Sequence, residues 1–240
     1  SARNQNEECD MPTEHYDVLA SLFAHPGLEF EADVTRAIVL HSELYARAAQ
    51  RLEEFKRLLP RGDLVVLREL HTRTFDVQAI TSLDIGYTLF GEDYKRGALL
   101  ANLSGEHTRA GNDCGAELGD HLTNVLRLLP KLADVALREE FVRVLLAPAL
   151  QEMIREFEPA RLAKKEELYK KHHRTIIEAA AGETRTVYRH ALEALYEVLR
   201  ADFALMVSLP IDQKSKFVGS IGTEMGIESC GACATNTRGT

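Results

Sequence analysis

Residues 28–59 read LEFEADVTRAIVLHSELYARAAQRLEEFKRLL and contain neither glycine nor proline. Apolar side chains recur in this stretch at spacings of three and four, which is the period of one face of an α-helix. They are Val34, Ile38, Leu44, Tyr45, Ala48, Leu52, Phe55, Leu58 and Leu59. Pro60 and Gly62 follow directly and are typical of a helix end. The stretch therefore predicts one long amphipathic helix over 28–59.

The same helical period continues on both sides of this stretch. Shorter apolar stripes precede it and follow it as far as Phe203, and one of them begins at Leu118. Pro148 falls inside a later stripe, where we expect a kink or a restart because proline has no amide hydrogen to donate. No two strand-like segments are joined by hairpin turn chemistry. We therefore predict an all-α fold, a single globular bundle of about eight to ten helices.

Two stretches interrupt the helical pattern. Residues 104–117, SGEHTRAGNDCGAE, hold three glycines and predict a loop between possible lobes 1–103 and 118–210. Residues 211–240 hold five glycines and few apolar residues, which favours a flexible C-terminal tail over a second domain. The helical domain is thus expected to span 1–210.

Composition and charge exclude several classes of function. The chain has 240 residues and a formal net charge of −8, which argues against nucleic-acid binding and is compatible with a basic peptide as partner. No apolar run approaches the ~20 residues that span a bilayer, so membrane insertion is not expected. The first residues lack the basic and apolar regions of a secretory signal, which makes the cytoplasm the expected compartment.

Histidine and cysteine supply the candidate metal ligands. Nine histidines leave a metal-binding helical-bundle enzyme with His and carboxylate ligands as an alternative function. Such bundles use Glu-x-x-His pairs, and the chain has none. Cys230-Gly-Ala-Cys233 lies in the glycine-rich tail without a second such pair, so it is only a weak indication of a metal or redox site. No catalytic motif occurs, and we expect no enzyme activity and no catalytic residues.

Residues 164–171, KKEELYKK, form a run of charges. Glu166 and Lys170, like Glu167 and Lys171, stand four residues apart, a spacing that favours a solvated helix face. A patch for a partner is the alternative.

The block over 72–129 is more informative. Its centre, TSLDIGYTLFG at 81–91, predicts that Gly91 ends a helix and that Asp93 caps the next one. Phe75 and Phe90 are the expected core anchors of the block.

Later in the same block, Asp120 and His121 follow the glycine-rich stretch directly. They place a carboxylate and an imidazole at the start of an amphipathic helix, where the helix dipole favours negative charge.

These residues resemble the TorD/DmsD/NarJ family of assembly chaperones for molybdenum enzymes. The resemblance rests on Leu83-Asp84, on Leu89-Phe90-Gly91 with Arg96, and on Asp120-His121 at the start of a helix. Arg96-Gly97 and Phe75-Asp76 look most like the nitrate reductase delta-subunit, or NarJ, branch.

The resemblance implies a cytoplasmic chaperone that is not an enzyme. Such proteins bind the N-terminal leader or twin-arginine signal peptide of the catalytic subunit of a molybdenum oxidoreductase, such as nitrate reductase. They hold the apo-enzyme until it receives molybdopterin guanine dinucleotide, and they hold no cofactor stably themselves. A monomer and a dimer are both compatible with this role, because lobes can be exchanged between protomers through 104–117.

The resemblance also implies a set of site residues. Asp120 is expected to pair with an arginine of the leader, and His121 to make that contact sensitive to pH. The implied peptide-binding residues are Asp84, Tyr87, Phe90, Arg96, Asp120 and His121, and the implied structural motif residues are Phe75, Asp76, Leu89, Gly91 and Gly97.

Overall fold

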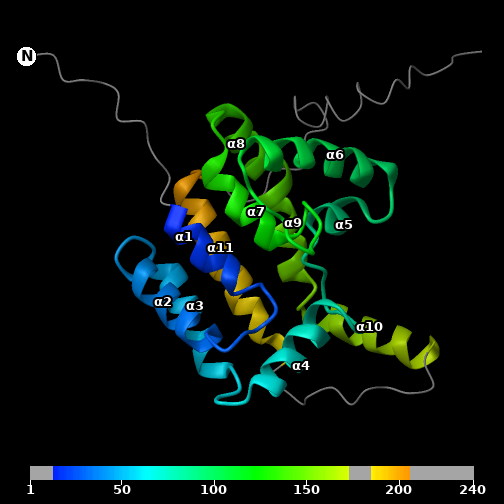
Figure 1. Ribbon diagram of the computed structural model, residues 1–240. Helices are drawn as coiled ribbons and strands as arrows, with labels where there is room; N and C mark the ends of the chain where they lie inside the picture. The colour runs from blue at the N-terminus through cyan, green and yellow to red at the C-terminus, as the bar shows by residue number, and fades with distance from the viewer. Residues whose placement is uncertain (1–12, 173–184, 206–240) are drawn as a thin grey trace, which may run out of the picture.

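The computed structural model describes residues 13–172 and 185–205 (Figure 1). The predicted tail 211–240, with Cys230 and Cys233, lies outside the described residues. The helices are α1 (Thr13–Ser21), α2 (Phe30–Ser42), α3 (Ala46–Leu58), α4 (Leu64–Phe75), α5 (Ile85–Phe90), α6 (Tyr94–Arg109), α7 (Leu122–Leu128), α8 (Val135–Phe141), α9 (Ala147–Arg155), α10 (Pro159–His172) and α11 (Val187–Asp202). A 3-10 turn, η1 (Leu129–Lys131), follows α7, and a π-helical segment, η2 (Val142–Leu146), joins α8 to α9.

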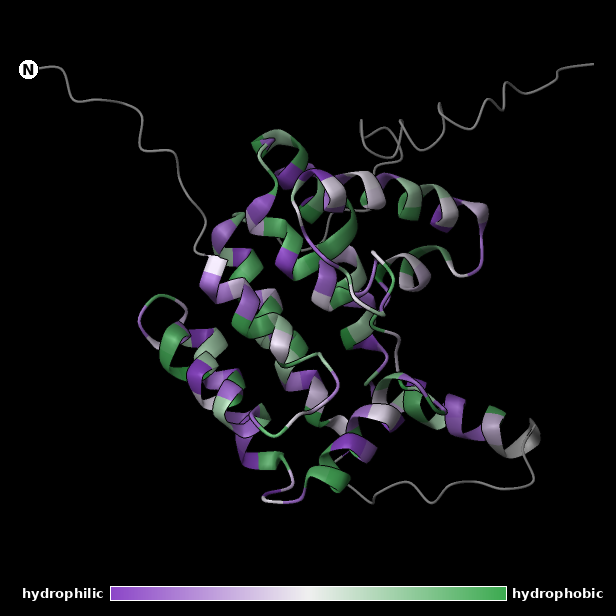
Figure 2. Ribbon diagram, viewed as in Figure 1, coloured by the Kyte–Doolittle hydropathy of each residue, from purple (hydrophilic) through white to green (hydrophobic). Residues whose placement is uncertain are grey.

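Counting α8, η2 and α9 as one continuous helix, the described residues form ten helices and no strand. The all-α prediction of about eight to ten helices is therefore confirmed. Hydrophilic (purple) and hydrophobic (green) residues alternate along the helices (Figure 2), as expected for amphipathic helices.

Helix α11 lies between two groups of helices. It packs against α3, which α2 covers on one side, and against α9 on the other. Helix α1 contacts both α2 and α7. Helices from both predicted lobes, 1–103 and 118–210, therefore share one hydrophobic core.

The prediction of one helix over 28–59 is wrong. The chain leaves the helical conformation at Tyr45 (φ −130°, ψ 59°) and forms the antiparallel pair α2 and α3 instead. A straight helix over this stretch would be about 48 Å long, and much of its apolar stripe would extend beyond the core. The reversal lets both halves bury that stripe, and Tyr45 secures it by donating a hydrogen bond to Asp202 (2.6 Å).

The expected irregularity at Pro148 is confirmed. The π-helical segment η2 ends just before it, and Pro148 occupies the first turn of α9. Because the proline ring would collide with the carbonyl four residues earlier in a regular helix, the wider π turn lets the chain continue past it.

The predicted loop over 104–117 begins too early, because α6 continues to Arg109. The hydroxyl of Thr108 donates to the carbonyl of Ser104 (2.8 Å) inside that last stretch of helix, and Gly111 then takes a positive φ of 58°. Helix α7 in turn begins at Leu122 instead of at the exposed Leu118.

Four histidines of the described residues are buried, and His41 and His71 are two of them. Burial lowers the pKa of these two, and the neighbouring His15 lowers that of His41 further while Asp202 opposes it. In the unfolded chain these imidazoles take up protons near pH 6.5, whereas in the folded chain they take them up only at a lower pH. Stability is therefore expected to be full above about pH 6.5 and to fall below it, by at most about 1.4 kcal/mol per histidine and pH unit.

Urea denaturation at pH 7.5 and pH 5.5 measures this loss. A His41→Leu variant is the comparison, and its stability is expected to depend less steeply on pH. Equal stability of the parent chain at both pH values would contradict the prediction.

Candidate functional site

Two segments distant in the sequence meet at the N-terminal ends of α5 and α7. Asp84 and His121 face each other in an isolated antiparallel bridge. The amide of Ile85 donates to the carbonyl of Asp120 across it (3.0 Å). The structure thus brings together the two segments on which the sequence-based site depends.

Arg96 reaches from α6 into this junction and binds both carboxylates. Its Nη2 donates to Oδ2 of Asp84 (2.7 Å), and its Nε donates to Oδ2 of Asp120 (3.0 Å). The guanidinium also lies 5.4 Å from the centre of the Tyr87 ring, a cation–π distance. We call Asp84, Arg96 and Asp120 the carboxylate–arginine cluster; two negative charges share one positive charge in it.

The carboxylates of the cluster differ in exposure. Asp120 is completely buried, whereas Asp84 is partly exposed. Burial and the charge of Asp120 raise the pKa of Asp84, and Arg96 opposes both effects. Because Asp120 is buried and already bound by Arg96, this geometry does not present it to a leader arginine as expected from the sequence. Its contact with Arg96 instead ties α6 to the start of α7.

His121, the residue after Asp120, caps α7. Its Nδ1 accepts from the backbone amide of Thr123 (3.4 Å) and lies 2.8 Å from the Thr123 hydroxyl. Burial lowers the pKa of His121, while the nearby carboxylates of Glu117 and Asp84 raise it. The imidazole, and not the Asp120 carboxylate, is therefore the capping group of this helix.

Gly86, which sequence reasoning did not select, is packed against the cluster. A Cβ built at this position would lie 2.6 Å from Oδ2 of Asp120 and 3.2 Å from Cγ of Arg96. The only signal for it in the sequence is a glycine inside an otherwise apolar helical pattern. The close approach of α5 to the cluster therefore requires a glycine here.

The other predicted residues surround this junction. Gly91 ends α5 with a φ of 62°, and Asp93 caps α6 by accepting from the amide of Lys95 (2.9 Å), so both predictions are confirmed. Phe75 is buried, whereas Phe90 is only partly buried.

Four further residues of the predicted set lie near the same place or along its helices. Tyr87 is 44% exposed, Leu89 packs against the edge of the core, Asp76 ends α4, and Gly97 lies on the exposed side of α6.

Side chains tie down the loop that precedes α7. The amide of Asn124 donates to the carbonyls of Cys114 (3.1 Å) and Leu118 (2.9 Å). His107 lies 2.9 Å from the carbonyl of Gly119 and 3.0 Å from the side-chain amide of Asn112. The glycine-rich stretch is therefore held in one conformation next to the cluster.

Replacing Asn124 with alanine is expected to remove the donor of the Cys114 carbonyl, whereas the Leu118 carbonyl keeps the amide of His121, and to cost about 1–3 kcal/mol. Hydrogen exchange of the amides in 112–121 is expected to become faster. Asn102→Ala, on α6, is the matched control. Unchanged exchange in Asn124→Ala would show that the loop does not depend on this side chain.

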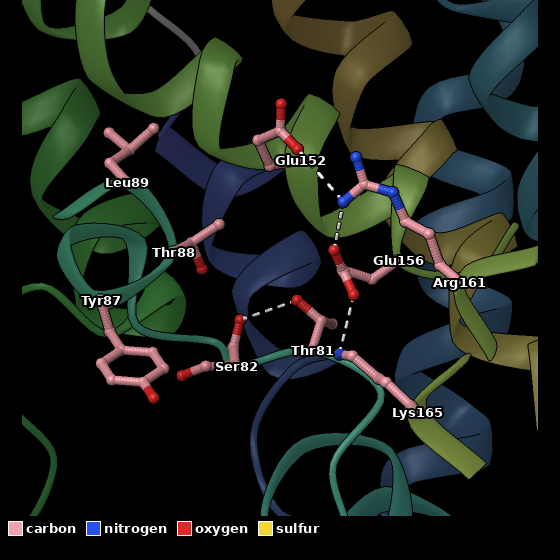
Figure 3. A pocket seen from close by; sticks show the side chains of 9 residues that line it. All are labelled: Thr81, Ser82, Tyr87, Thr88, Leu89, Glu152, Glu156, Arg161 and Lys165. Carbon is pink, nitrogen blue, oxygen red and sulfur yellow. Dashed lines mark hydrogen bonds and ion pairs between the residues drawn. The ribbon is translucent and has the colours of Figure 1, made fainter. Parts of the chain in front are cut away.

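A cavity of about 530 Å³ opens on the other side of Tyr87 (Figure 3). It lies between the chain preceding α5, helix α5 itself, α9 and α10. Its lining residues are Thr81, Ser82, Tyr87, Thr88, Leu89, Glu152, Glu156, Arg161 and Lys165.

Four charged side chains on one side of this cavity form ion pairs, and Arg155, outside the lining, binds one of them, Glu152. Glu156 accepts from Lys165 (2.8 Å) and from Arg161, which also lies 3.6 Å from Glu152. Lys165 donates as well to the backbone carbonyl of Ile80. Burial raises the pKa of Glu156, but hydrogen bonds from Lys165 and Arg161 outweigh it and hold that pKa below its usual value. Sequence reasoning missed this group, because it assigned Lys165 to a solvated helix face.

Within the described residues, no three His, Cys, Asp or Glu side chains are close enough together to hold a metal ion. They thus provide no observation that favours the alternative of a metal-binding helical-bundle enzyme. The same part of the chain contains no helix that is both long and apolar enough to cross a bilayer.

Comparison with known proteins gives no match to this chain, whether among family models, curated proteins or solved structures.

Proposed function

We propose that this chain is a cytoplasmic chaperone that binds the N-terminal leader of a molybdenum oxidoreductase catalytic subunit, nitrate reductase or a related respiratory enzyme. It holds the apo-subunit while molybdopterin guanine dinucleotide is inserted. It acts by binding, not by catalysis.

One observation supports this proposal above the others. The residues that carry the family resemblance come from three separate segments, and they meet in the carboxylate–arginine cluster and the Asp84–His121 bridge. A resemblance due to chance would give no reason for these segments to be in contact. The contact between these segments supports a common function of the motif residues.

The surroundings of the cluster suit a basic, partly apolar peptide. Tyr87 exposes its ring between the cluster and the cavity, and Leu89 adds an apolar wall. The cluster carries one uncompensated negative charge, and the whole chain carries −8, which speeds encounter with a cationic partner. A leader that folds as an amphipathic helix would place its apolar face here.

The test has two parts. Affinity purification of the chain from anaerobically grown native host cells, followed by mass spectrometry, is expected to recover a molybdenum-enzyme catalytic subunit. Fluorescence anisotropy then measures the binding of a labelled leader peptide of that subunit. Recovery of no such subunit would contradict the proposal.

Two tyrosines allow a matched comparison of the binding surface. Tyr87→Ser is expected to weaken leader binding by about fivefold or more, as truncation of a central aromatic contact does. Tyr94→Ser removes a tyrosine that is 57% exposed on α6 and lies outside the cavity lining, and it is expected to bind as the parent does. Equal weakening in both variants would argue against this site.

A further inference from the structure

The cavity beside α5 already contains a guanidinium supplied by this chain. Arg161 extends from α10 toward two carboxylates one helical turn apart, that of Glu152 on α9 and that of Glu156 directly after it (Figure 3). The same chemistry occurs on the other side of Tyr87, where Arg96 lies between Asp84 and Asp120. Each side of the exposed tyrosine thus has a guanidinium between two carboxylates.

The two guanidinium sites differ in how easily they exchange their occupant. Arg96 is largely buried, and one of its carboxylates is wholly so. Arg161 is 42% exposed and is attached by a long, flexible side chain. Its pair with Glu152 is exposed on both sides and contributes only about 0–1 kcal/mol, and the less exposed Glu156 keeps Lys165 when Arg161 leaves. Arg161 can therefore swing into solvent at little cost, whereas Arg96 cannot.

Lys165 keeps the empty site in place when Arg161 leaves. Its ammonium is bound both by Glu156 and by the carbonyl of Ile80, so α10 stays attached to the chain before α5. Departure of Arg161 makes the group one unit more negative and frees Oε2 of Glu152 and Oε1 of Glu156, while Arg155 keeps its ion pair with Oε1 of Glu152. The vacated carboxylates then attract a cation of the same shape.

We propose that the Glu152–Glu156 site binds an arginine side chain of the partner peptide, and that Arg161 is an internal competitor which occupies the site when the peptide is absent. The inference rests on the proposed function for the identity of the peptide. To that function it adds Glu152 and Glu156 as the residues that select an arginine. It also adds Arg161 as a competing group that a peptide has to displace before it binds.

An anionic ligand fits the same cavity poorly. It would have to compete with Glu156 for Lys165 or Arg161, and it would be repelled by the carboxylates of Glu152 and Glu156 in the same lining. A cationic ligand needs only the exchange of one guanidinium for another. The hydroxyls of Thr81 and Thr88 and the ring of Tyr87 remain available to the rest of an arginine-containing peptide.

The experiment compares two probes on matched variants. The first probe is the labelled leader peptide, in its natural form and with each arginine replaced by citrulline, which keeps the shape and removes the charge. Arg161→Met is expected to bind the arginine peptide about three- to fivefold more tightly, the factor that loss of an exposed ion pair implies. Glu152→Gln and Glu156→Gln are each expected to bind it more weakly by a similar factor. The citrulline peptide is expected to bind all variants alike.

Arg36→Met is the control, because it removes an arginine from an exposed ion pair with Glu14 outside the cavity. It is expected to bind both peptides as the parent does. Binding of the arginine peptide that is unchanged or weakened in Arg161→Met would overturn the inference, as would equal binding of the citrulline peptide to the parent chain.

The second probe separates this inference from the proposed function. Nα-acetyl-argininamide, titrated at millimolar concentration and followed by NMR, is expected to shift amide signals of 80–82 and 152–156 in Arg161→Met, while acetyl-citrullinamide does not. If this shift occurs but no leader peptide binds, the arginine site holds and the chaperone proposal is wrong. If the leader binds but neither probe responds to Arg161→Met, the chaperone proposal holds and the arginine site is wrong.

Discussion

Replacement of Arg96 by methionine is expected to lower the free energy of unfolding by about 3–5 kcal/mol, the usual effect of removing one partner from a buried ion pair. The variant keeps an unbranched apolar stem in place of the arginine stem but leaves the buried Asp120 carboxylate without its cation. Urea denaturation at pH 7 measures the effect as a lower midpoint with an unchanged slope.

The double variant Arg96→Met/Asp120→Asn identifies the cause. Once the uncompensated charge is removed, a substantial part of the lost stability is expected to return. Arg36→Met is the control, because its ion pair with Glu14 is exposed, and it is expected to change stability by less than about 1 kcal/mol. If Arg96→Met and Arg36→Met had equal effects, the cluster would have no structural importance.

Replacement of Gly86 by alanine is expected to cause the second large loss of stability. The new methyl group would collide with Asp120 at 2.6 Å and with Leu99 at 3.0 Å. Asp120 is held by Arg96 and cannot move aside freely. The added methyl group therefore both overpacks the site and weakens the ion pair between Arg96 and Asp120, and both effects destabilise the fold. We expect a loss of about 3 kcal/mol, seen as a fall in Tm of roughly 6–12 °C for a chain of this size.

Gly97 provides the matched control for this substitution. It also lies in a helix, but a Cβ at its position meets nothing within 4 Å. Gly97→Ala is expected to stabilise the chain by up to about 1 kcal/mol, since alanine is the better helix former. A Gly86→Ala variant as stable as Gly97→Ala would show that α5 does not need its close approach to the cluster. The family resemblance selected Gly97, whereas the packing identifies Gly86.

The helical class and several helix ends could be predicted because they depend on local chemistry. The turn at Gly91, the cap at Asp93 and the irregularity at Pro148 each follow from one residue and its nearest neighbours. The reversal between α2 and α3 could not be predicted in this way. No glycine or proline marks it, and the contact of Tyr45 with Asp202 that secures it joins opposite ends of the chain.

In the candidate site, too, the residues of the cluster could be predicted from the sequence but their long-range contacts could not. The sequence indicated Asp84, Arg96 and Asp120 as site residues, but not that they bind one another. The role of Asp120 changed for that reason: a residue expected to face a ligand is buried by a partner 24 positions away. Lys165 was missed because a charged run on a helix resembles a solvated face, and its contact with Ile80 spans 85 positions.

The packing of α11 on α3 also bears on how the chain is made. Helix α3 is synthesised early, but the helix that covers it is the last one described. At about 5–20 residues per second, the ribosome needs roughly 6 to 26 seconds to proceed from Leu58 to Val187. During that time the apolar face of α3 lacks its partner on the nascent chain. Folding of the shared core therefore has to wait until translation has passed Asp202, and premature chain termination before that point would release a polypeptide prone to aggregation.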